Sequence, residues 1–344
     1  MKRHGNGRIV MRADAGESIG FGHFVRSAAL AGYLRNDFEC LLTTHNPSGP
    51  LLPFQKRLAE ENGATLVALD GPGRQGVDKH FLSLLQEGDI AVLDNYFYTT
   101  DYQRQVRAKC GRLVHIDDMH DRHFVADLLI TVCPLEASEF SMEPFTRFLG
   151  GVDYTFLRAP FLAPAIRRDG IRISRRMVLA IGGADPLRLT DKMIRVVRAV
   201  SPEIHIDVIA GATVEILSPE GEHLTIWRQL TAEEIVRIFD EADWGIFPAS
   251  TVCIEAMARK LPVLAGYYVD NQEEFYARGV ERGWFGAMGN LSDDEHALTE
   301  RLRAQLENAA GIKESPGFNF IEKKREITEA FLNLKNSPLT TLPK

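Results

Sequence analysis

Short apolar runs alternate with amphipathic stretches along the whole of this 344-residue chain, and this alternation limits the folds open to it. A short apolar run predicts a buried strand, whereas apolar residues that recur every three or four positions predict a helix. Strands that alternate with helices form βαβ units, which build parallel sheets covered by helices on both faces. The chain is therefore predicted to be an α/β protein.

The predicted elements follow one another from end to end. In the first half, strands are predicted at 8–12, 39–43, 65–69, 90–94, 113–116 and 128–132, with helices at 24–35, 54–62, 79–86 and 102–110. In the second half, strands are predicted within 178–185, 205–213, 224–230, 244–250 and 262–268, with helices at 190–200, 232–242, 251–259, 273–282, 293–308 and 320–334. Thr231 and Glu234 have the spacing of a capping box at the start of one helix.

The proline-containing segment 150–170 interrupts this rhythm and predicts an interdomain linker. We therefore predict an N-terminal Rossmann-like domain at 1–155 and a C-terminal Rossmann-like domain at 156–318. A C-terminal helix at 319–335 is expected to pack near their junction, followed by a flexible tail at 336–344. Ligands of parallel sheets bind outside the carboxyl ends of the strands, so the two domains are expected to face a central cleft.

Composition excludes several classes of protein. A formal net charge of −7 argues against nucleic acid as a partner, because neutralising phosphates requires clustered Lys and Arg. The four cysteines lie far apart, which fits neither a disulfide framework nor a zinc knuckle and favours a reducing compartment. The N-terminus lacks the apolar stretch of a signal peptide, and no run has the length of a membrane span. We therefore expect a cytoplasmic protein.

The first candidate site is the loop after the first predicted strand, with Arg12, Asp14, Gly20, Gly22 and His23. Glycines let backbone N–H groups approach a ligand closely, and the N-terminus of the next helix carries partial positive charge. That charge favours a neutral imidazole, the form that a general base requires. In the alternative interpretation, the glycines only make a turn and the histidine merely caps the helix.

The second candidate site is the stretch PASTVCIEAMARKLPVL at 248–264, in which a strand leads through a Ser/Thr turn into a helix. Ser250 or Thr251 is predicted to cap this helix, whose free N–H groups suit a diphosphate. Glu255 lies one turn further on, where a carboxylate can accept both hydroxyls of a ribose. The alternative is a surface glutamate on an ordinary βαβ unit.

The third candidate is VHIDDMHDRH at 114–123, which is rich in histidine and aspartate. These are good ligands for transition metals, but their positions follow no standard spacing for two ligands on one helix. We therefore expect no metal. Asp117 and Asp118, with Asp94 and Tyr96 after the preceding strand, are instead expected to face the same cleft, where they could bind sugar hydroxyls and amides.

These motifs resemble the PseG/SpsG-type UDP-sugar hydrolases, the UDP-2,4-diacetamido-2,4,6-trideoxy-beta-L-altropyranose hydrolase family. The resemblance runs in colinear order over about residues 8–285 and is carried by RADAGESIGFGHFVRSAALAGYL, LDNY, IDD…DR…AD, FLRAPF, IGGADP, AST…EAMARKLPVL and VDNQ. It implies the GT-B fold, which this family shares with MurG-type glycosyltransferases, and a nucleotide held mainly by the C-terminal domain.

The resemblance also implies an activity: inverting attack of water on the anomeric carbon of a UDP-linked 2,4-diacetamido-2,4,6-trideoxyhexose or similar amino sugar, in pseudaminic acid or other bacterial surface-glycan synthesis. No metal and no cofactor are implied, and His23 is the implied catalytic residue, acting as general base. The sugar-binding residues expected are Arg12, Asp14, Gly20, Gly22, Asp94, Tyr96, Asp117, Asn271 and Gln272. The nucleotide-binding residues expected are Gly182, Gly183, Ser250, Thr251 and Glu255.

Two other functions stay open on the sequence. One is a GT-B glycosyltransferase that passes the sugar to an acceptor alcohol. The other is a non-catalytic protein that only binds a nucleotide sugar, which would give His23 no task. In all three cases the expected partners are a UDP-amino sugar and UDP, without nucleic acid or a membrane span, and the chain is expected to be a monomer.

Overall fold

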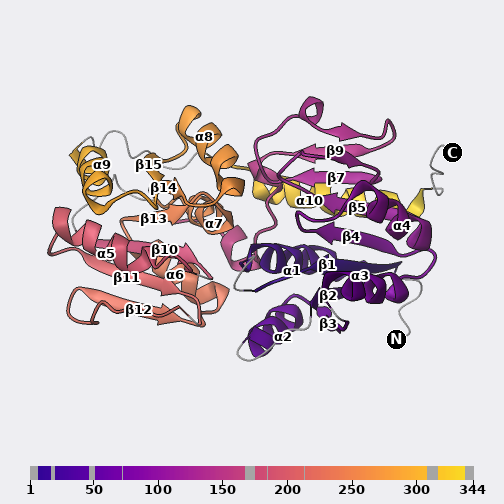
Figure 1. The fold of residues 1–344 in the computed structure, drawn as a ribbon, viewed down its shortest axis with the longest axis horizontal. Coiled ribbons are helices and arrows are strands. Elements are labelled where there is room, and N and C mark those ends of the chain that lie inside the picture. The colour runs from indigo at the N-terminus through magenta and orange to yellow at the C-terminus, as the bar shows by residue number, and fades with distance from the viewer. Residues whose placement is uncertain are drawn as a thin grey trace. The chain divides into compact units, whose positions relative to one another are not determined.

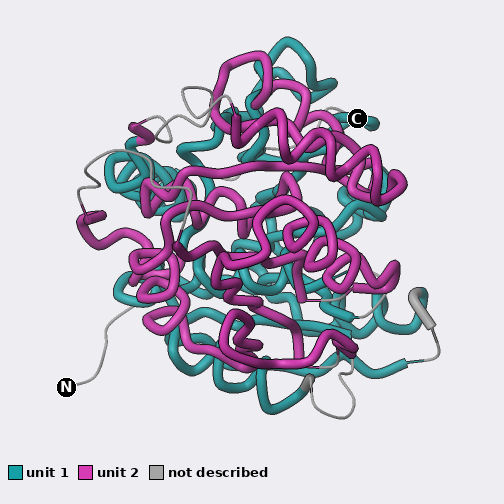
Figure 2. The backbone as a smooth tube through the Cα atoms, turned by 90° about the vertical axis from the view of Figure 1, so that its left-hand side faces the viewer, with its two compact units in different colours: residues 1–157, 319–344 teal, residues 158–318 magenta. Residues whose placement is uncertain are grey.

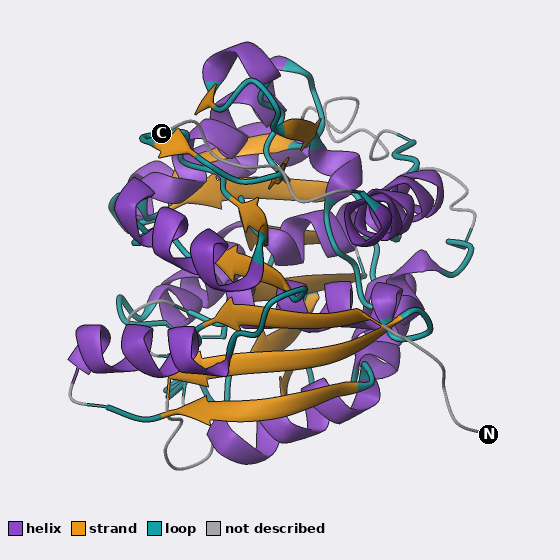
Figure 3. Ribbon diagram, turned by 90° about the vertical axis from the view of Figure 1, so that its right-hand side faces the viewer, coloured by secondary structure: helices purple, strands orange, loops and turns teal. Residues whose placement is uncertain are grey.

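The computed structural model confirms the α/β architecture, with parallel strands flanked by helices (Figures 1 and 3). It describes residues 7–16, 20–45, 51–71, 73–166, 175–183, 185–212, 214–307 and 317–337. The chain divides into two compact units, one formed by residues 1–157 and 319–344 and the other by residues 158–318 (Figure 2). Each unit is built around its own parallel sheet.

The sheet of the first unit has seven strands in the order β3-β2-β1-β4-β5-β7-β9. The strands are β1 (Gly7–Ala13), β2 (Phe38–His45), β3 (Ala64–Leu69), β4 (Ile90–Asp94), β5 (Arg112–Ile116), β7 (Leu128–Thr131) and β9 (Arg147–Gly150). The helices are α1 (Gly22–Leu34), α2 (Leu51–Glu61), α3 (Gly73–Leu84), α4 (Thr100–Cys110) and α10 (Phe320–Asn336). Two short strands, β6 (His123–Phe124) and β8 (Ser141–Met142), pair with each other.

The sheet of the second unit has six strands in the order β12-β11-β10-β13-β14-β15. The strands are β10 (Arg176–Gly182), β11 (His205–Ala210), β12 (Leu224–Arg228), β13 (Trp244–Pro248), β14 (Val263–Tyr267) and β15 (Gly286–Asn290). The helices are α5 (Leu189–Val200), α6 (Ala232–Glu241), α7 (Thr251–Ala258), α8 (Glu273–Glu281) and α9 (Glu295–Glu307). The capping box predicted for α6 is confirmed, since Thr231 and Glu234 exchange hydrogen bonds.

The strand order of each sheet fixes where a ligand is expected to bind. In the first sheet the chain moves outward from β1 to β3 and then returns to place β4 on the other side of β1. In the second sheet, β10 lies in the same way between β11 and β13. Loops that leave such neighbouring strands in opposite directions open a crevice at their carboxyl ends, where open α/β sheets bind ligands.

The central strands are apolar because both of their faces are buried. In the first unit, Val10, Leu93 and Leu113 belong to one cluster of fully buried side chains. In the second unit, Trp244 and Ile206 belong to another. Each such side chain contributes roughly 1.5–3 kcal/mol when it leaves water, so the sheet centres are rigid supports for the loops at their ends.

Two edge strands, β9 and β15, are absent from the sequence prediction. Their sequences, RFLG and GAMGN, show neither an apolar run nor a clear alternation. They become strands because β7 and β14 offer free edges with which they pair. Tertiary pairing thus overrides a weak local preference.

The chain enters the second unit through two short 3₁₀ turns, η2 (Val152–Tyr154) and η3 (Ala159–Leu162), which occupy part of the predicted linker. The last helix, α10, returns to the first unit and packs against α1 and η2. The hydroxyl of Tyr154 donates to the Glu326 carboxylate at 2.5 Å, and Lys324 lies over the ring of Tyr33. Among the helices that the structure describes, none combines the length and apolar character needed to cross a bilayer.

Candidate functional site

The loop between β1 and α1 brings His23 to the carboxyl edge of the first sheet. Gly16 and Gly20 exchange two backbone hydrogen bonds, of 3.1 and 2.8 Å, which close the loop into a narrow turn. Gly20 has a φ of +72°, in the left-handed region that glycine adopts without strain. Helix α1 then begins at Gly22, so His23 lies inside its first turn. The helix predicted from the sequence begins at residue 24, after His23, and that boundary is wrong.

His23 pairs with Asp94, the last residue of β4. Its Nδ1 lies 2.7 Å from the Asp94 Oδ1, and both side chains are buried. Asp94 is the register partner of Ala13, the last residue of β1, so the pair sits where β1 and β4 diverge. The imidazole and its carboxylate thus occupy the switch point of the first sheet.

The neighbours of Nδ1 settle which ring nitrogen carries the proton. The Arg26 Nη2 lies 3.2 Å from Nδ1, but it also donates to the Asp94 Oδ1 at 2.6 Å. A guanidinium can only donate and a carboxylate can only accept, so the Nδ1 of His23 donates to Asp94. The other nitrogen, Nε2, is then the basic one, and none of the described residues forms a hydrogen bond to it.

Asp94 accepts hydrogen bonds from three neighbouring side chains, those of His23, Arg26 and Ser27. The Arg26 Nε donates to both of its oxygens at 3.0 Å, and the Ser27 hydroxyl donates to Oδ2 at 2.8 Å. Burial raises the pKa of Asp94, but the charges of Arg26 and His23 outweigh burial and hold that pKa well below its ordinary value. Asp94 therefore stays ionised and cannot take the proton from His23.

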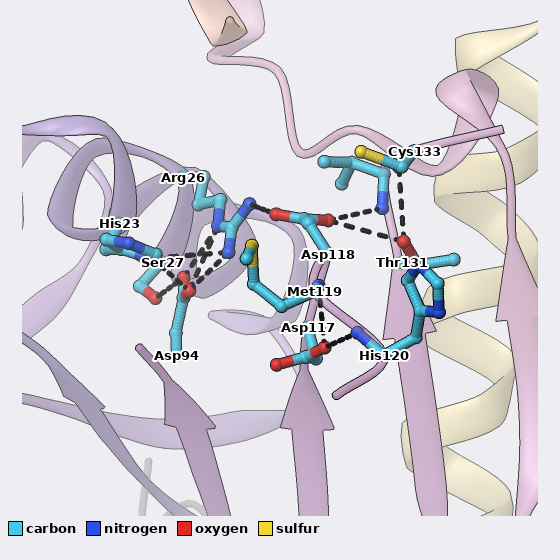
Figure 4. Close-up of polar contacts among 11 residues, drawn as sticks. His23, Arg26, Ser27, Asp94, Asp117, Asp118, Met119, His120, Thr131 and Cys133 are labelled. Carbon is cyan, nitrogen blue, oxygen red and sulfur yellow. Dashed lines mark hydrogen bonds and ion pairs between the residues drawn. The ribbon is translucent and has the colours of Figure 1, made fainter. Parts of the chain in front are cut away.

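Arg26 also reaches a second carboxylate. Its Nη1 donates to the Asp118 Oδ2 at 2.6 Å, while the Asp118 Oδ1 accepts from the Thr131 hydroxyl and the Val132 N–H (Figure 4). Burial lowers the pKa of Arg26, but the two carboxylates outweigh it and raise that pKa well above its ordinary value. We call His23, Arg26, Asp94 and Asp118 the His23 cluster.

Tyr96 and Asp117 lie close to this cluster. The Tyr96 ring meets the His23 ring edge to face, with centroids 4.5 Å apart. The Asp117 Oδ1 accepts from the backbone N–H groups of Met119 and His120 at 2.8 Å each (Figure 4). Its Oδ2 is buried and has no hydrogen-bond partner among the described residues. Burial, together with the Asp118 charge, raises the pKa of Asp117 to about 6 against the opposing effect of the two N–H groups.

Arg12 and Asp14 form a buried ion pair of their own. The Arg12 Nη2 lies 2.9 Å from the Asp14 Oδ2, and Nη1 lies 3.1 Å from the Asp78 Oδ1. Asp14 also accepts from the backbone N–H of His45 at 2.7 Å, which ties the loop after β1 to the end of β2. Only 1% of Arg12 is exposed, so its ion pairs with Asp14 and Asp78 stabilise the fold around the loop. The expected contact between Arg12 and a sugar stays a prediction.

In the second unit, Gly182 is the last residue of β10 and Gly183 follows it, at the switch point of that sheet. Gly182 has a φ of +131°, and a Cβ placed on Gly211 would collide with the Gly183 carbonyl oxygen. The turn therefore brings two backbone segments into close contact. Asp185 accepts from the N–H groups of Leu189 and Thr190 and caps α5.

Helix α7 follows β13, the strand that pairs with β10. Ser250 occupies its N-cap position, but its hydroxyl makes no capping bond and instead donates to the Pro248 carbonyl at 3.4 Å. The predicted side-chain cap at Ser250 is therefore wrong, because the turn at Pro248 directs the hydroxyl backward. The first N–H groups of the helix, from Thr251 onward, are left without that side-chain acceptor.

Glu255 lies inside α7 and is 5% exposed. Its Oε1 accepts from the Arg158 Nε at 3.1 Å and from Nη2 at 2.8 Å. Burial raises the pKa of Glu255, although Arg158 acts in the opposite direction. Asn271 and Gln272 belong to η4 (Asp270–Gln272), where the Gln272 Oε1 accepts from the backbone N–H of Tyr268 at 3.0 Å.

The histidine-rich stretch does not gather metal ligands. Over the described ranges, no three side chains of His, Cys, Asp or Glu lie close enough together to hold an ion. His115 is fully buried, and burial lowers its pKa to about 3. The His123 ring contacts the Ser141 hydroxyl and Glu143 instead.

Sequence reasoning left Arg26, Ser27 and Arg158 out of the predicted site, and it gave Asp118 a contact with the sugar and not with Arg26. One signal was present for Arg26, which lies three residues after His23 and therefore on the same face of α1. Arg158 lies in the FLRAPF motif. No local pattern pointed to Ser27, since its role depends on β4 lying beside the helix.

Comparison with known proteins gives two related sequences and many related folds. No family model matches the chain. An uncharacterized protein of Methanocaldococcus jannaschii is 21% identical over 291 residues, covering 78% of this chain, which spans only 57% of that protein's length. The UDP-2,4-diacetamido-2,4,6-trideoxy-beta-L-altropyranose hydrolase of Campylobacter jejuni is 23% identical over 291 residues, covering 80% of this chain and 97% of that protein.

Many solved structures are similar in fold to this chain. A proposed UDP-N-acetylglucosamine 2-epimerase from Listeria monocytogenes has a TM-score of 0.62 at 11% identity and covers 98% of both chains. Spinosyn rhamnosyltransferase has a TM-score of 0.58 at 12% identity, covering 95% of this chain and 96% of its own. An Anabaena protein solved with UDP-glucose has a TM-score of 0.57 at 12% identity, and the likeness covers 95% of this chain and 99% of the Anabaena chain. These likenesses confirm the GT-B fold.

Proposed function

We propose that the chain is a UDP-sugar hydrolase that cleaves the anomeric C–O bond of a UDP-linked 2,4-diacetamido-2,4,6-trideoxyhexose, or a similar amino sugar. The products are UDP and the free sugar, as in pseudaminic acid or related bacterial surface-glycan synthesis. The likeness to the Campylobacter jejuni hydrolase, which extends over nearly all of that protein, supports this assignment. The observation that carries it is the pairing of His23 with Asp94.

The pairing supports a general-base mechanism. With Nδ1 donating to Asp94, the free Nε2 of His23 takes a proton from water, and the water oxygen attacks the anomeric carbon. The bond from that carbon to the UDP oxygen breaks, its electron pair leaves with UDP, and the configuration inverts. Positioned general bases contribute about 10²–10⁴-fold to rate. Asp94 stabilises the imidazolium that forms.

The second unit is proposed to hold the nucleotide. The Gly182–Gly183 turn and the start of α7 at Ser250 and Thr251 offer backbone N–H groups to a diphosphate, whose charge grows as the bond breaks. Glu255, steadied by Arg158, is proposed to accept the ribose hydroxyls. The remaining predicted residues are assigned to the sugar and its phosphates: Arg12, Asp14, Gly20, Gly22, Tyr96, Asp117, Asn271 and Gln272.

A GT-B glycosyltransferase is the second candidate, favoured by the transferases among the similar folds. Its chemistry needs the same base, which would then deprotonate an acceptor hydroxyl in place of water. Incubation of the protein with a UDP-amino sugar in H₂¹⁸O, without any acceptor, separates the two. A hydrolase releases one free sugar per UDP, with ¹⁸O at the anomeric carbon and none in UDP. Absence of turnover until an acceptor alcohol is added would favour the transferase.

Replacement of the base tests the mechanism directly. His23→Ala is expected to lower kcat by about 10²–10⁴-fold while UDP still binds, because only the proton acceptor is removed. His123→Gln, which changes a partly exposed histidine of the same unit, is the matched control and should keep wild-type turnover. A His23→Ala protein with wild-type kcat would refute the assignment, and a protein that binds the nucleotide sugar without turnover would indicate a binding protein.

A further inference from the structure

The His23 cluster contains one more negative charge than positive charge. Arg26 contributes one positive charge, and Asp94 and Asp118 contribute two negative charges, all from side chains at least nine-tenths buried. With a neutral imidazole the cluster carries a net charge of −1, and with an imidazolium it is neutral. Burying an uncompensated charge is costly, so the extra carboxylate is placed to compensate the imidazolium that forms at His23 in the proposed reaction.

Asp118 is the residue that creates this imbalance. Arg26 alone would cancel the charge of Asp94, and an imidazolium would then face a neutral pair. The Asp118 carboxylate is held on its other side by the Thr131 hydroxyl at 3.3 Å and the Val132 N–H at 3.2 Å, at the end of β7. It therefore fixes the position of the guanidinium as well as adding charge.

We infer that Asp118 is a positioning residue for the proposed reaction, which acts through Arg26 to orient Asp94 and to supply the negative charge that the protonated His23 requires. The inference rests on the proposed function, in which His23 takes a proton from water. Asp118 does not contact His23 itself; the guanidinium lies between them, 2.6 Å from Asp118 and 3.2 Å from the imidazole Nδ1.

The groups that face His23 come from three elements. Within the described ranges, Asp94 faces it from β4, Tyr96 from the loop after β4, and Arg26 from α1 itself. Asp118, after β5, acts through Arg26. Among these groups, Arg26 carries the positive charge that opposes protonation of the imidazole. The two carboxylates favour that charge, and removing Asp118 leaves only one of them.

Asp118→Asn tests the inference, because it keeps the size of the side chain and removes its charge. We expect kcat to fall about 10–100-fold, as for other partners that orient a reacting group, with KM changed little. The acid limb of the pH–rate profile should move to lower pH by about one unit, since the imidazolium loses its compensating charge. Asp127→Asn is the matched control, since Asp127 forms a buried pair with Arg107 in the same unit.

The ring ¹⁵N resonances of His23, assigned by comparison with His23→Ala, give a second readout that does not depend on turnover. In Asp118→Asn the neutral ring should keep its proton on Nδ1, but the ring should become protonated at a lower pH than in the wild type. An unchanged titration and kcat, or equal effects in Asp127→Asn, would overturn the inference. Failure of the wild type to hydrolyse any UDP-sugar would refute the proposed function alone, because the ring titration still tests Asp118.

A milder variant covers the case in which Asp118→Asn does not fold. Thr131→Val removes the hydroxyl that donates to the Asp118 Oδ1 but leaves every charge of the cluster in place. A lower kcat with unchanged KM and an unmoved acid limb is expected, because orientation is loosened and charge is not. A kcat equal to the wild-type value would contradict the positioning role.

Discussion

Asp117 allows a quantitative test of how burial acts on this protein. Its pKa is raised from 3.8 to about 6, chiefly because the carboxyl is buried, with its Oδ2 unpaired among the described residues. A carboxyl with a higher pKa in the folded protein binds its proton more tightly there. The resulting stability is complete below about pH 4 and is lost as the pH rises through 6. Each pKa unit corresponds to 1.36 kcal/mol, so the loss amounts to about 3 kcal/mol.

Asp117→Asn removes this titration. The amide keeps an oxygen for the N–H groups of Met119 and His120, while its unpaired NH₂ costs about 1–3 kcal/mol at every pH alike. The prediction therefore concerns the pH dependence. The unfolding free energy of the variant minus that of the wild type should rise by about 3 kcal/mol between pH 4 and pH 7.5.

Thermal unfolding over this pH range measures the difference. For a unit of this size, 3 kcal/mol corresponds to about 6–12 °C in Tm. The Tm of the variant minus that of the wild type should therefore be higher by this amount at pH 7.5 than at pH 4. Asp101→Asn, which removes a carboxylate whose side chain is 84% exposed, is the comparison variant for the change from carboxylate to amide. A flat profile for Asp117→Asn, or one with the opposite slope, would refute the reasoning from burial.

Two further predictions concern the second unit. Glu255→Gln should weaken UDP binding about 10-fold in calorimetry, because hydrogen bonds to a charged group contribute about 1.5–3 kcal/mol. The same variant should bind 2′,3′-dideoxy-UDP as the wild type does, and an equal loss for both ligands would argue against a ribose contact. Gly211→Ala should lower the unfolding free energy by about 1–3 kcal/mol and weaken UDP binding, because its Cβ would displace the Gly183 carbonyl. Gly221→Ala, where a Cβ would meet no atom within 4 Å, is the control, and equal stability of the two variants would contradict the steric argument.

Most of the fold could be predicted from local patterns. The strand predicted at 90–94 coincides with β4, and the capping box predicted at Thr231 and Glu234 is formed. These features depend on residues close together in the chain, whose periodicity and capping chemistry act locally. The start of α1 was misjudged by two residues, because glycine at position 22 gives no helical signal.

The candidate site could be predicted in part. Its residue types and its location after the first strand are present in the sequence, and so is the spacing of His23 and Arg26 on one helix face. The sequence does not show which residues pair with His23 and Arg26. Asp94 is 71 positions from His23, and Asp118 is 92 positions from Arg26.

The sequence by itself determined the alternation of strands and helices, because side-chain periodicity decides which local structure can bury its apolar face. Only the tertiary structure decided that β1 lies beside β4 and β4 beside β5, which brings Asp94 and Asp118 to one guanidinium. It also decided the burial of Arg12 and Asp117. The physical reason is that burial and ion pairing depend on the order of the strands in the sheet, which is set by packing between residues far apart in the chain.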